Sequence, residues 1–391
     1  MAPLVSAVSG PAGMNLPLLD TPAMRDQVAQ ALLTAAPRLP QLSAFVGADG
    51  FVDEIIHVVD KRTNAESFQR LESIAQLGER IRAAAGKSTN VELVTQRTKL
   101  GGNGPIMANA LSSLGLQLTY LGALGYPALH PVFADFAQRA EVHSIAEPGH
   151  TDALEFEDGK IMITKTVQLN EVTWANIQTR YGRAAFIEKF NQADLVAFVN
   201  WTMVPFMSDL WDALLREVCP RMTGPRRLAF FDLADPEKRS RADIQRALEQ
   251  MVQFERYFDV ILGLNEKEAC EIGAVLGLAT PDRSPAGLAE LAAGIQARQP
   301  LGTLVIHPVA YALAASNGDI FRVQGPFCAK PRISTGAGDH FNAGFCLGRL
   351  LGLDPPSSLL TGVSASGYYV RNGQSPSLSQ LAGLQRHWPA D

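Results

Sequence analysis

The sequence has few cysteines, no long apolar run and no excess of positive charge. Its four cysteines lie far apart and form no CxxC pair, which argues against a zinc site or a disulfide scaffold and fits a reducing cytoplasm. No apolar stretch approaches the roughly 18 residues that span a bilayer, and the N-terminus lacks the basic start of a secretory signal. The formal net charge of −5 gives no sign of a polyanion-binding surface. We therefore expect a cytoplasmic protein that binds neither nucleic acid nor a membrane.

What the sequence does contain is a regular alternation of buried strands and amphipathic helices. The 391 residues, 47% of them hydrophobic, suffice for one large α/β domain. Residues 1–41 are rich in Pro and Ala and are predicted to form an N-terminal extension. From residue 42 to 391, short apolar runs such as DLVAFVNW and FDVILGLN alternate with helical stretches such as PFMSDLWDALLREV. This pattern predicts an α/β fold with a mostly parallel sheet covered by helices on both faces.

One segment departs from this alternation. The stretch TDALEFEDGKIMITKTVQLNEVTW has strand-like periodicity on both sides of Asp158 and Gly159, which is a strong hairpin signal. An antiparallel excursion inside a parallel α/β chain indicates a small β lid, with segments near residues 52–62 and 151–168. The alternative is an ordinary surface hairpin.

Polar residues follow the first strand and open the next helix. Ligands of such sheets bind beyond the carboxyl ends of the strands. Asp49 and Asp53 lie there in GADGFVDEI, where carboxylates accept hydrogen bonds from the hydroxyls of a polar ligand or merely solvate a turn. In KLGGNGPIMANALSSLG, Gly101 and Gly102 allow close backbone approach and Asn103 offers an amide.

A second group of polar residues follows two later strands. The run RLAFFDLAD ends in Asp232 and Asp235, and FDVILGLN leads into Asn265 and Glu268. The last two residues have the spacing of a capping box at a helix start. Alternatively, these oxygens hold the water shell of a Mg²⁺ ion, which prefers carboxylates and keeps much of its hydration.

The stretch RISTGAGDHFNAGF places small residues and one carboxylate directly before a helix-like run. Helix N-termini carry partial positive charge and unpaired N–H groups, so Gly336, Ala337 and Gly338 form a suitable cradle for an anion. A bound phosphate repels Asp339, unless that carboxylate takes a proton from a nucleophile that attacks the phosphate. The structural alternative is an acid favoured at a helix N-terminus by the dipole.

These motifs together resemble the PfkB/ribokinase family of carbohydrate kinases. STGAGDHFNAGF resembles its C-terminal signature, GGNGPIMANALSSLG its N-terminal signature, NEKEA its Asn-x-x-Glu motif and GADGFVDEI its sugar-binding strand end. The resemblance extends from about residue 42 to the end. It implies a ribokinase-like, doubly wound sheet with a small β lid. It also implies a Mg²⁺-dependent phosphotransferase that moves the γ-phosphoryl of ATP to a hydroxyl of a sugar or related small polyol.

The resemblance also implies a role for each candidate residue. Asp339 is the implied general base, and the implied anion hole comprises Gly336, Ala337 and Gly338. The implied acceptor-binding residues are Asp49, Asp53, Gly101, Gly102 and Asn103. The implied nucleotide-binding residues are Asn265, Thr335 and His307. Glu268 and Asn265 are the implied metal residues, acting through water.

Two departures from the family pattern leave alternatives open. The family often has an asparagine five residues after the first glycine of the GG pair, where this chain has Ile106. His307 and Pro308 stand where small nucleotide-contacting residues are expected, and His307 either touches a phosphate or is packed. A nucleoside kinase, an ADP-dependent sugar kinase and a catalytically silent ligand-binding relative therefore stay as alternatives. A monovalent cation and a homodimer stay open too.

Overall fold

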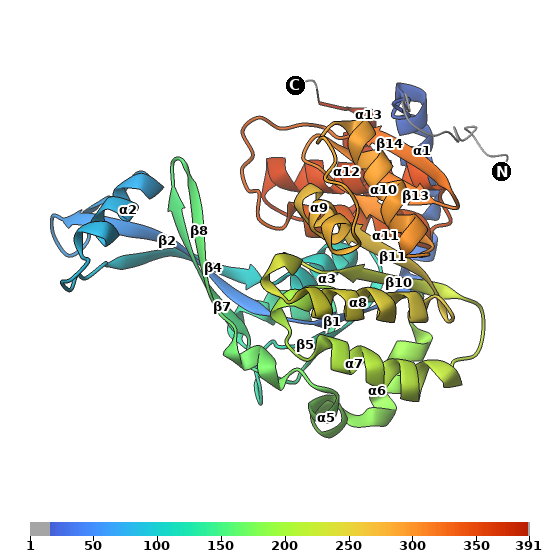
Figure 1. Cartoon of the computed structure of the whole chain (residues 1–391), viewed down its shortest axis with the longest axis horizontal. Helices are drawn as coiled ribbons and strands as arrows, with labels where there is room; N and C mark the ends of the chain where they lie inside the picture. Colours follow the sequence, from blue (N-terminus) through green and yellow to red (C-terminus); the bar gives the residue numbers. More distant parts are fainter. Residues whose placement is uncertain (1–15, 390–391) are drawn as a thin grey trace.

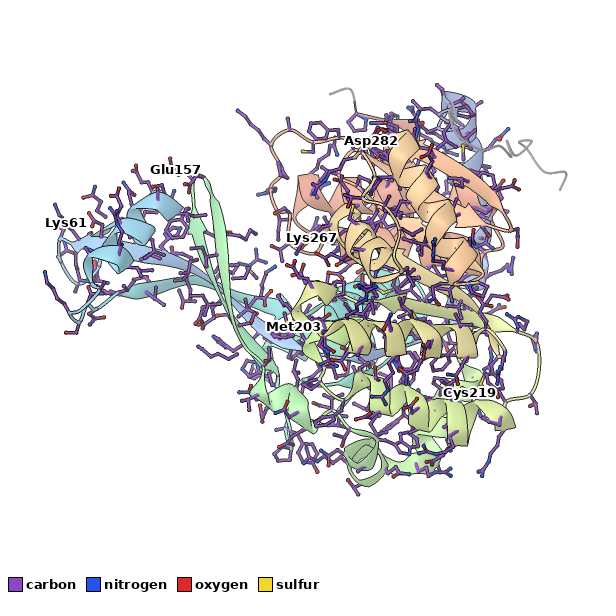
Figure 2. All side chains as sticks on the ribbon, viewed as in Figure 1. Lys61, Glu157, Met203, Cys219, Lys267 and Asp282 are labelled. Atoms are coloured by element: carbon purple, nitrogen blue, oxygen red, sulfur yellow. The ribbon has the colours of Figure 1, made fainter. Side chains whose placement is uncertain are left out.

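The computed structural model describes residues 16–389, so the first 15 residues of the predicted extension lie outside the described part. These residues form a large α/β body and a β lid that projects from one side of it (Figure 1). In Figure 2, Lys61 and Glu157 lie on the outer part of this lid, whereas Met203 lies where the lid meets the body.

The body is built on a nine-stranded sheet. Its spatial order is β14-β13-β12-β11-β10-β9-β1-β5-β6. The strands are β1 (Ser43–Ala48), β5 (Gln117–Gly122), β6 (Glu141–Ser144), β9 (Leu195–Phe198), β10 (Arg227–Asp232), β11 (Phe258–Leu264), β12 (Thr303–Ile306), β13 (Tyr311–Ser316) and β14 (Asp319–Gln324). All pairs from β6 to β12 are parallel, and β13 and β14 add antiparallel pairs at one edge. The chain winds outward from β1 in both directions, which confirms the predicted doubly wound, mostly parallel sheet.

Helices cover both faces of this sheet and create two hydrophobic cores. Phe45 of β1 belongs to one core and its neighbour Val46 to the other, because successive strand side chains point to opposite faces. The first core packs against α5 (Trp174–Asn176), α6 (Arg183–Gln192), α7 (Met207–Ala213), α8 (Arg241–Phe254), α9 (Glu266–Val275) and α10 (Pro285–Arg298). The second packs against α1 (Pro22–Ala35), α3 (Asn103–Ser113), α4 (Ala134–Ala137), α11 (Ala337–Leu350), α12 (Pro355–Asn372) and α13 (Leu378–Arg386).

Helix α1 comes from the predicted N-terminal extension, yet it packs on the body. Thr21 caps its first turn by accepting a hydrogen bond from the Met24 N–H, and Val28 and Leu32 are buried in the second core. The Arg25 guanidinium lies 4.3 Å from the ring centroid of Trp388 near the end of the chain. Within residues 16–389, no helix is both long and apolar enough to cross a membrane.

The lid is a five-stranded sheet with one helix. Its strands are β2 (Phe51–Arg62), β3 (Phe68–Arg70), β4 (Leu93–Gly101), β7 (Gly149–Phe156) and β8 (Gly159–Lys165), and its helix is α2 (Ile74–Ala83). The central strand β2 pairs parallel with β7 and antiparallel with β3 and β4, and β7 pairs antiparallel with β8. The segments predicted near residues 52–62 and 151–168 therefore lie in β2, β7 and β8, and sequence reasoning missed β3, β4 and α2.

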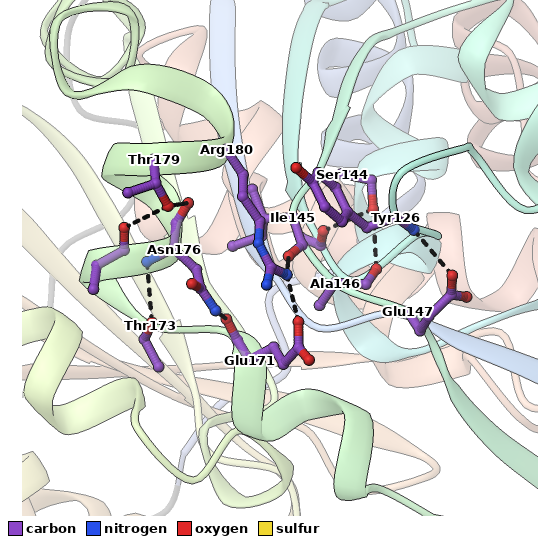
Figure 3. A network of polar contacts seen from close by, with 12 residues as sticks. Tyr126, Ser144, Ile145, Ala146, Glu147, Glu171, Thr173, Asn176, Thr179 and Arg180 are labelled. Carbon is purple, nitrogen blue, oxygen red and sulfur yellow. Dashed lines mark hydrogen bonds and ion pairs between the residues drawn. The ribbon is translucent and has the colours of Figure 1, made fainter.

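Polar contacts fix the base of the lid to the body (Figure 3). Arg180 donates a hydrogen bond of 2.6 Å to the carbonyl of Ile145, which lies just before β7. The same guanidinium pairs with Glu171, which follows β8, and lies 4.5 Å from the ring centroid of Tyr126. One arginine thus bridges the segments that precede and follow the β7–β8 hairpin, so the base of the lid is constrained while its tip extends beyond the body.

Candidate active site

A cavity of about 490 Å³ lies between the lid and the carboxyl ends of the body strands. We call it the main cavity. Its lid wall contains Phe51, Asp53, Thr151, Met162 and Thr164; its body wall contains Gly102, Asn103, Ile106, Asn200, Met203, Asp232, Ala234, Asp235, Asn265, Glu268, His307, Thr335, Gly336, Gly338 and Asp339. Most of the predicted site residues therefore lie on one surface, which is where ligands of doubly wound sheets bind.

The N-terminus of α11 forms one side of the main cavity. Gly336 is the N-cap residue with φ 92°, a left-handed conformation that favours glycine. The N–H groups of Gly338 and Asp339 lie in the first helical turn, where a helix offers no internal partner. The Ala337 N–H donates to the Ser334 carbonyl at 3.1 Å. The predicted anion cradle thus has the geometry of a helix N-terminus, with one of its N–H groups engaged by the preceding turn.

Asp339 lies in this first turn with only 6% of its surface exposed. Its Oδ1 accepts a hydrogen bond of 3.0 Å from the Asn103 amide, which links the N-termini of α11 and α3. Burial raises the pKa of Asp339 to about 8; the Asn103 hydrogen bond opposes this shift, and the charges of Asp49 and Glu268 add to it. In the ligand-free protein this carboxyl therefore keeps its proton up to about pH 8, and it becomes a proton acceptor near neutral pH when positive charge bound beside it lowers the pKa.

A second acid on the same wall is Glu268. Glu268 forms the predicted capping box with Asn265: its Oε2 accepts from the Asn265 N–H at 2.9 Å, and the Asn265 side chain accepts from the Glu268 N–H at 2.9 Å. Glu268 Oε1 also accepts from the Asp235 N–H at 3.0 Å. Both residues still face the cavity, so the capping role and exposure to a ligand coexist in the same pair.

Asp235 on this wall is paired with Lys238 and Lys267, whereas Asp232 and Glu268 form no salt bridge among residues 16–389. Burial raises the pKa of Asp232 well above its usual value, and the nearby charges of Glu268 and Asp339 raise it further. The pKa of Glu268 is raised too, first by burial. Asp232 accepts a hydrogen bond from the Asn342 amide at 2.9 Å, and the buried Asn342 Oδ1 has no hydrogen-bond partner among the described residues. A cluster of carboxylate and amide oxygens with this charge excess fits a Mg²⁺ ion.

The lid supplies a carboxylate on the opposite side of the cavity. Asp53 is 4% exposed, and the Lys99 ammonium of the paired strand β4 lies 3.9 Å from its Oδ2. Burial raises the pKa of Asp53, while Lys99, Thr151 and Lys160 oppose the shift. A Cβ atom at Gly101 would overlap the Asp53 carboxylate. The glycine at position 101 is therefore needed to leave room for Asp53.

Asp49, predicted to contact the acceptor, lies below the cavity wall rather than on it. Asp49 has no exposed surface and is absent from the cavity wall. Its Oδ1 accepts from the Gly104 N–H at 2.9 Å and its Oδ2 from the Asn200 amide at 2.6 Å, and burial raises its pKa to about 6. Asp49 therefore supports the start of α3 from below. Gly102, the N-cap residue of α3 with φ 92°, lines the cavity instead.

A second cavity of about 370 Å³ adjoins the main one and shares Asn265, His307 and Gly338 with it. Its other lining residues include Pro308, Val309, Pro326, Phe327, Phe341, Val363 and Val370. The His307 ring lies 4.8 Å from that of Phe341, and burial lowers its pKa to about 4. His307 therefore packs against Phe341 and is neutral near pH 7, and its imidazole lies on the wall of both cavities, which share Gly338 of the first turn of α11.

His340, which sequence reasoning passed over, holds the Gly336 carbonyl in place. Its Nδ1 lies 2.7 Å from Gly336 O and its Nε2 lies 2.8 Å from Ser375 Oγ. A carbonyl only accepts hydrogen bonds, so the proton lies on Nδ1 and Nε2 accepts from the Ser375 hydroxyl. Ser375 in turn accepts from the Asn109 amide at 3.1 Å. Burial lowers the pKa of His340 to about 4, so this directed chain stays neutral.

Other wall residues carried weak sequence signals. Asn200 lies near the end of the run DLVAFVNW and had the same positional signal as Asp49. Met162 and Thr164 alternate along β8, as the hairpin pattern implied, but the pattern does not say which row faces the cavity. Thr335 was predicted to bind the nucleotide. The sequence did not indicate that its hydroxyl accepts a 2.7 Å hydrogen bond from Lys160 of the lid, 175 positions away.

Comparison with known proteins places the chain in a family. The family model described as prokaryotic ketohexokinase matches residues 23–387. A ketohexokinase of Haloferax volcanii is 28% identical over 340 residues, which cover 86% of this chain and 88% of that protein. The family model spans nearly the whole chain, and its match begins within α1.

Similar solved structures have the same fold. Ribokinase of Arabidopsis thaliana, solved with ribose and ATP, has a TM-score of 0.61 at 14% identity and covers 88% of this chain and 98% of its own. Ribokinase of Cryptococcus neoformans with ADP has a TM-score of 0.61 at 16% identity, with the same coverage. Both the predicted family resemblance and the predicted carbohydrate kinase are confirmed. The chain belongs to the prokaryotic ketohexokinase family of ribokinase-like sugar kinases.

Proposed function

We propose that this protein transfers the γ-phosphoryl group of ATP to a hydroxyl of a ketohexose. The observation that carries the proposal is the placement of Asp339, a buried carboxylate in the first turn of α11. It lies on the wall of the main cavity, next to Gly338, which lines both cavities. A proton acceptor and a helix N-terminus thus lie together where a sugar and a nucleotide would meet. Family membership supports the ketohexose as acceptor.

The sugar binds in the main cavity in this proposal. Asp53 accepts hydrogen bonds from its hydroxyls, and the backbone at Gly102 approaches it closely. Asn103 orients Asp339 through their 3.0 Å hydrogen bond. The nucleotide base lies in the second cavity, between Val363, Val370 and the loop that follows β12. Its phosphates extend past Thr335 and Asn265 toward the N-terminus of α11, where the helix dipole favours negative charge.

The transfer follows from this arrangement. Asp339 takes the proton of the acceptor hydroxyl while the hydroxyl oxygen forms a bond to the γ-phosphorus. The bond from this phosphorus to the bridging oxygen breaks, and its electron pair leaves with ADP. The N–H groups of Gly338 and Asp339 stabilise the charge on the transferred group, together with the Ala337 N–H once it exchanges Ser334 for the phosphate.

A divalent cation belongs to this proposal. The residues that would hold Mg²⁺ are Asp232, Glu268 and Asn265, the last two through water. When bound, the ion neutralises the negative charge of the phosphates. The lid acts separately, by covering the sugar: Met162 and Thr164 lie on the roof of the main cavity. With water excluded, the phosphoryl group passes to the sugar rather than to solvent.

The acceptor assignment is tested with a panel of substrates. Purified protein with Mg²⁺ and ATP is offered a ketohexose, an aldohexose, a pentose and a nucleoside, and formation of ADP and of the phosphorylated product is measured. We expect the highest kcat/KM for the ketohexose. A higher value for the nucleoside would favour a nucleoside kinase, and replacing ATP by ADP without loss of turnover would contradict the choice of donor.

The general-base assignment predicts a large kinetic effect of Asp339→Asn. The amide keeps the shape and accepts no proton, so kcat falls by about 10²–10⁴-fold. Nucleotide affinity holds or rises, because a negative charge beside the phosphates is lost. Asp209→Asn is the matched control, since Asp209 is an exposed acid in the first turn of α7. If Asp339 served only the helix dipole, both variants would lose a little stability and keep their kcat.

The role of Asp53 in acceptor binding predicts a rise in sugar KM. Asp53→Asn removes a charge-assisted hydrogen bond worth about 1.5–3 kcal/mol, so KM for the ketohexose rises about tenfold or more. Calorimetry should give an ADP affinity near that of the wild type. Glu54→Gln is the control, because Glu54 follows Asp53 on β2 and points to the other face of the lid. A loss of ADP affinity without a change in sugar KM would place Asp53 in the nucleotide site.

The buried acids predict that the ligand-free protein loses stability as pH rises. The folded-state pKa values of Asp339 (about 8) and Asp49 (about 6) are raised above the ordinary value, and that of Asp232 is raised as well. Their stabilising contribution is thus complete below about pH 4 and is lost as pH rises through these values. We expect the melting temperature without metal to fall between pH 5 and 8.5, and Mg²⁺ to reverse the fall. Asp232→Asn should flatten the pH profile and abolish the Mg²⁺ effect; an unchanged profile would contradict the proposed metal site.

A further inference from the structure

Lys160 continues the row of lid residues that faces the main cavity. Side chains of one strand alternate between its two faces, so Thr164, Met162 and Lys160 of β8 share a face. Thr164 and Met162 line the cavity, and Lys160 lies one step further toward the tip of the hairpin, opposite Glu155 of β7. The lid therefore directs a positively charged side chain along the roof of the site.

The Lys160 ammonium reaches the body at the start of α11. It donates a 2.7 Å hydrogen bond to Thr335 Oγ1, and Thr335 directly precedes the N-cap residue Gly336. The Thr335 carbonyl accepts a 2.9 Å hydrogen bond from the Tyr369 hydroxyl, so the partner of Lys160 is itself held in place. The ammonium thus lies beside the N–H groups that form the predicted anion cradle.

Lys160 contacts a neutral hydroxyl rather than a carboxylate, which is unusual for a lysine close to a helix N-terminus. Two other lid lysines have carboxylate partners: Lys99 lies 3.9 Å from Asp53, and Lys165 lies 3.0 Å from Asp152. Lys160 instead contacts a neutral hydroxyl near the positive end of the α11 dipole, where a cation is disfavoured. Two positive features converge on one point of the cavity wall, and an anion between them relieves the repulsion.

The position also falls between the two proposed substrates. The positive charge of Lys160 opposes the rise that burial causes in the pKa of Asp53, the acceptor-side carboxylate, while its hydrogen bond is with Thr335 on the phosphate side. A group that reaches both sides lies near the path along which a phosphoryl group crosses from nucleotide to sugar. A flexible ammonium with three donors is suited to follow this transfer.

We propose that Lys160 is a catalytic residue: in the closed complex its ammonium leaves Thr335 Oγ1 and donates hydrogen bonds to the oxygens of the γ-phosphoryl group during transfer. The inference rests on the proposed kinase function. Asp339 still takes the hydroxyl proton and ADP still leaves with the electron pair; Lys160 stays protonated and stabilises the negative charge of the transferred group. Because this charge comes with the lid, the site is complete only when the lid is closed, which ties catalysis to the exclusion of water.

Lys160→Met tests the proposal with a matched control on the same strand. We expect kcat to fall about 10²-fold or more, the effect of losing one positioned donor to a transition-state oxygen, with little change in sugar KM. Lys160→Arg should recover part of kcat. Lys165→Met removes an equal charge from the other face of β8 and should leave kcat near the wild-type value. A Lys160→Met kcat within twofold of wild type would overturn the proposal.

A purely structural latch between Lys160 and Thr335 makes a different prediction. If the hydrogen bond only held the lid closed, Thr335→Val would reproduce the kcat of Lys160→Met, and the double variant would be no worse than either. If Lys160 contacts the γ-phosphoryl group, Lys160→Met is more severe than Thr335→Val. Lys160→Met should then also weaken the binding of β,γ-imido-ATP more than it weakens the binding of ADP, as measured by calorimetry. Equal losses for the two nucleotides would support the latch.

The binding experiment separates this inference from the proposed function. If the ketohexose is not the acceptor, the kinetic comparison is repeated with whichever panel substrate is turned over, and the expected ratios are unchanged. If the wild type turns over none of them, the proposed function fails, while the affinity ratio of β,γ-imido-ATP to ADP still decides whether Lys160 senses the γ-phosphoryl group. An unchanged ratio in Lys160→Met would then overturn the inference by itself.

Discussion

Three carboxylates share one poorly hydrated space at the carboxyl ends of the strands, and their mutual repulsion is the constraint on which the rest of the site depends. Asp232, Glu268 and Asp339 all have raised pKa values, with burial as the largest cause. Such a cluster is tolerated only where positive groups surround it or protons neutralise it. The N-terminus of α11 and the amides of Asn103 and Asn342 supply part of this compensation. A metal ion and the lid lysines are suited to supply the rest.

The fold brings this cluster together from segments far apart in the chain. Parallel strands end at the same edge of the sheet, so Asp232 after β10 and Glu268 after β11 become neighbours. Because α3 packs beside α11, the Asn103 amide can donate a hydrogen bond to Asp339, which lies 236 positions later in the chain. Buried contacts below the cavity position these groups: Asp49 accepts hydrogen bonds from Gly104 and Asn200, which holds the start of α3, where Asn103 lies. A catalytic geometry of this kind depends on groups that never touch a substrate.

How much could be read from the sequence depended on how local each signal was. The doubly wound sheet, the helix start at Gly336 and the capping box of Asn265 and Glu268 depend on short-range patterns, and all three are present in the structure. Asp49 was assigned to the acceptor because the sequence shows that it follows a strand. The sequence does not show that its hydrogen-bond partner is Asn200, 151 positions away. His340 and Lys160 were missed for the same reason: their contacts with Ser375 and Thr335 depend on tertiary packing, which one sequence does not specify.

The charges of the site also explain why a lid is needed. Burial lowers the pKa values of His307 and His340 to about 4, so neither histidine adds a positive charge near neutral pH. Two lid lysines contact residues of the cavity wall: Lys99 of β4 lies 3.9 Å from Asp53, and Lys160 of β8 donates a hydrogen bond to Thr335. The lid thus brings positive charge close to the acids of the body, since the charge of Lys99 opposes the rise in the pKa of Asp339. In the proposed complex, a sugar between Asp53 of the lid and Asp339 of the body favours the closed position of the lid. Closure then removes water when the phosphoryl group is most exposed to it.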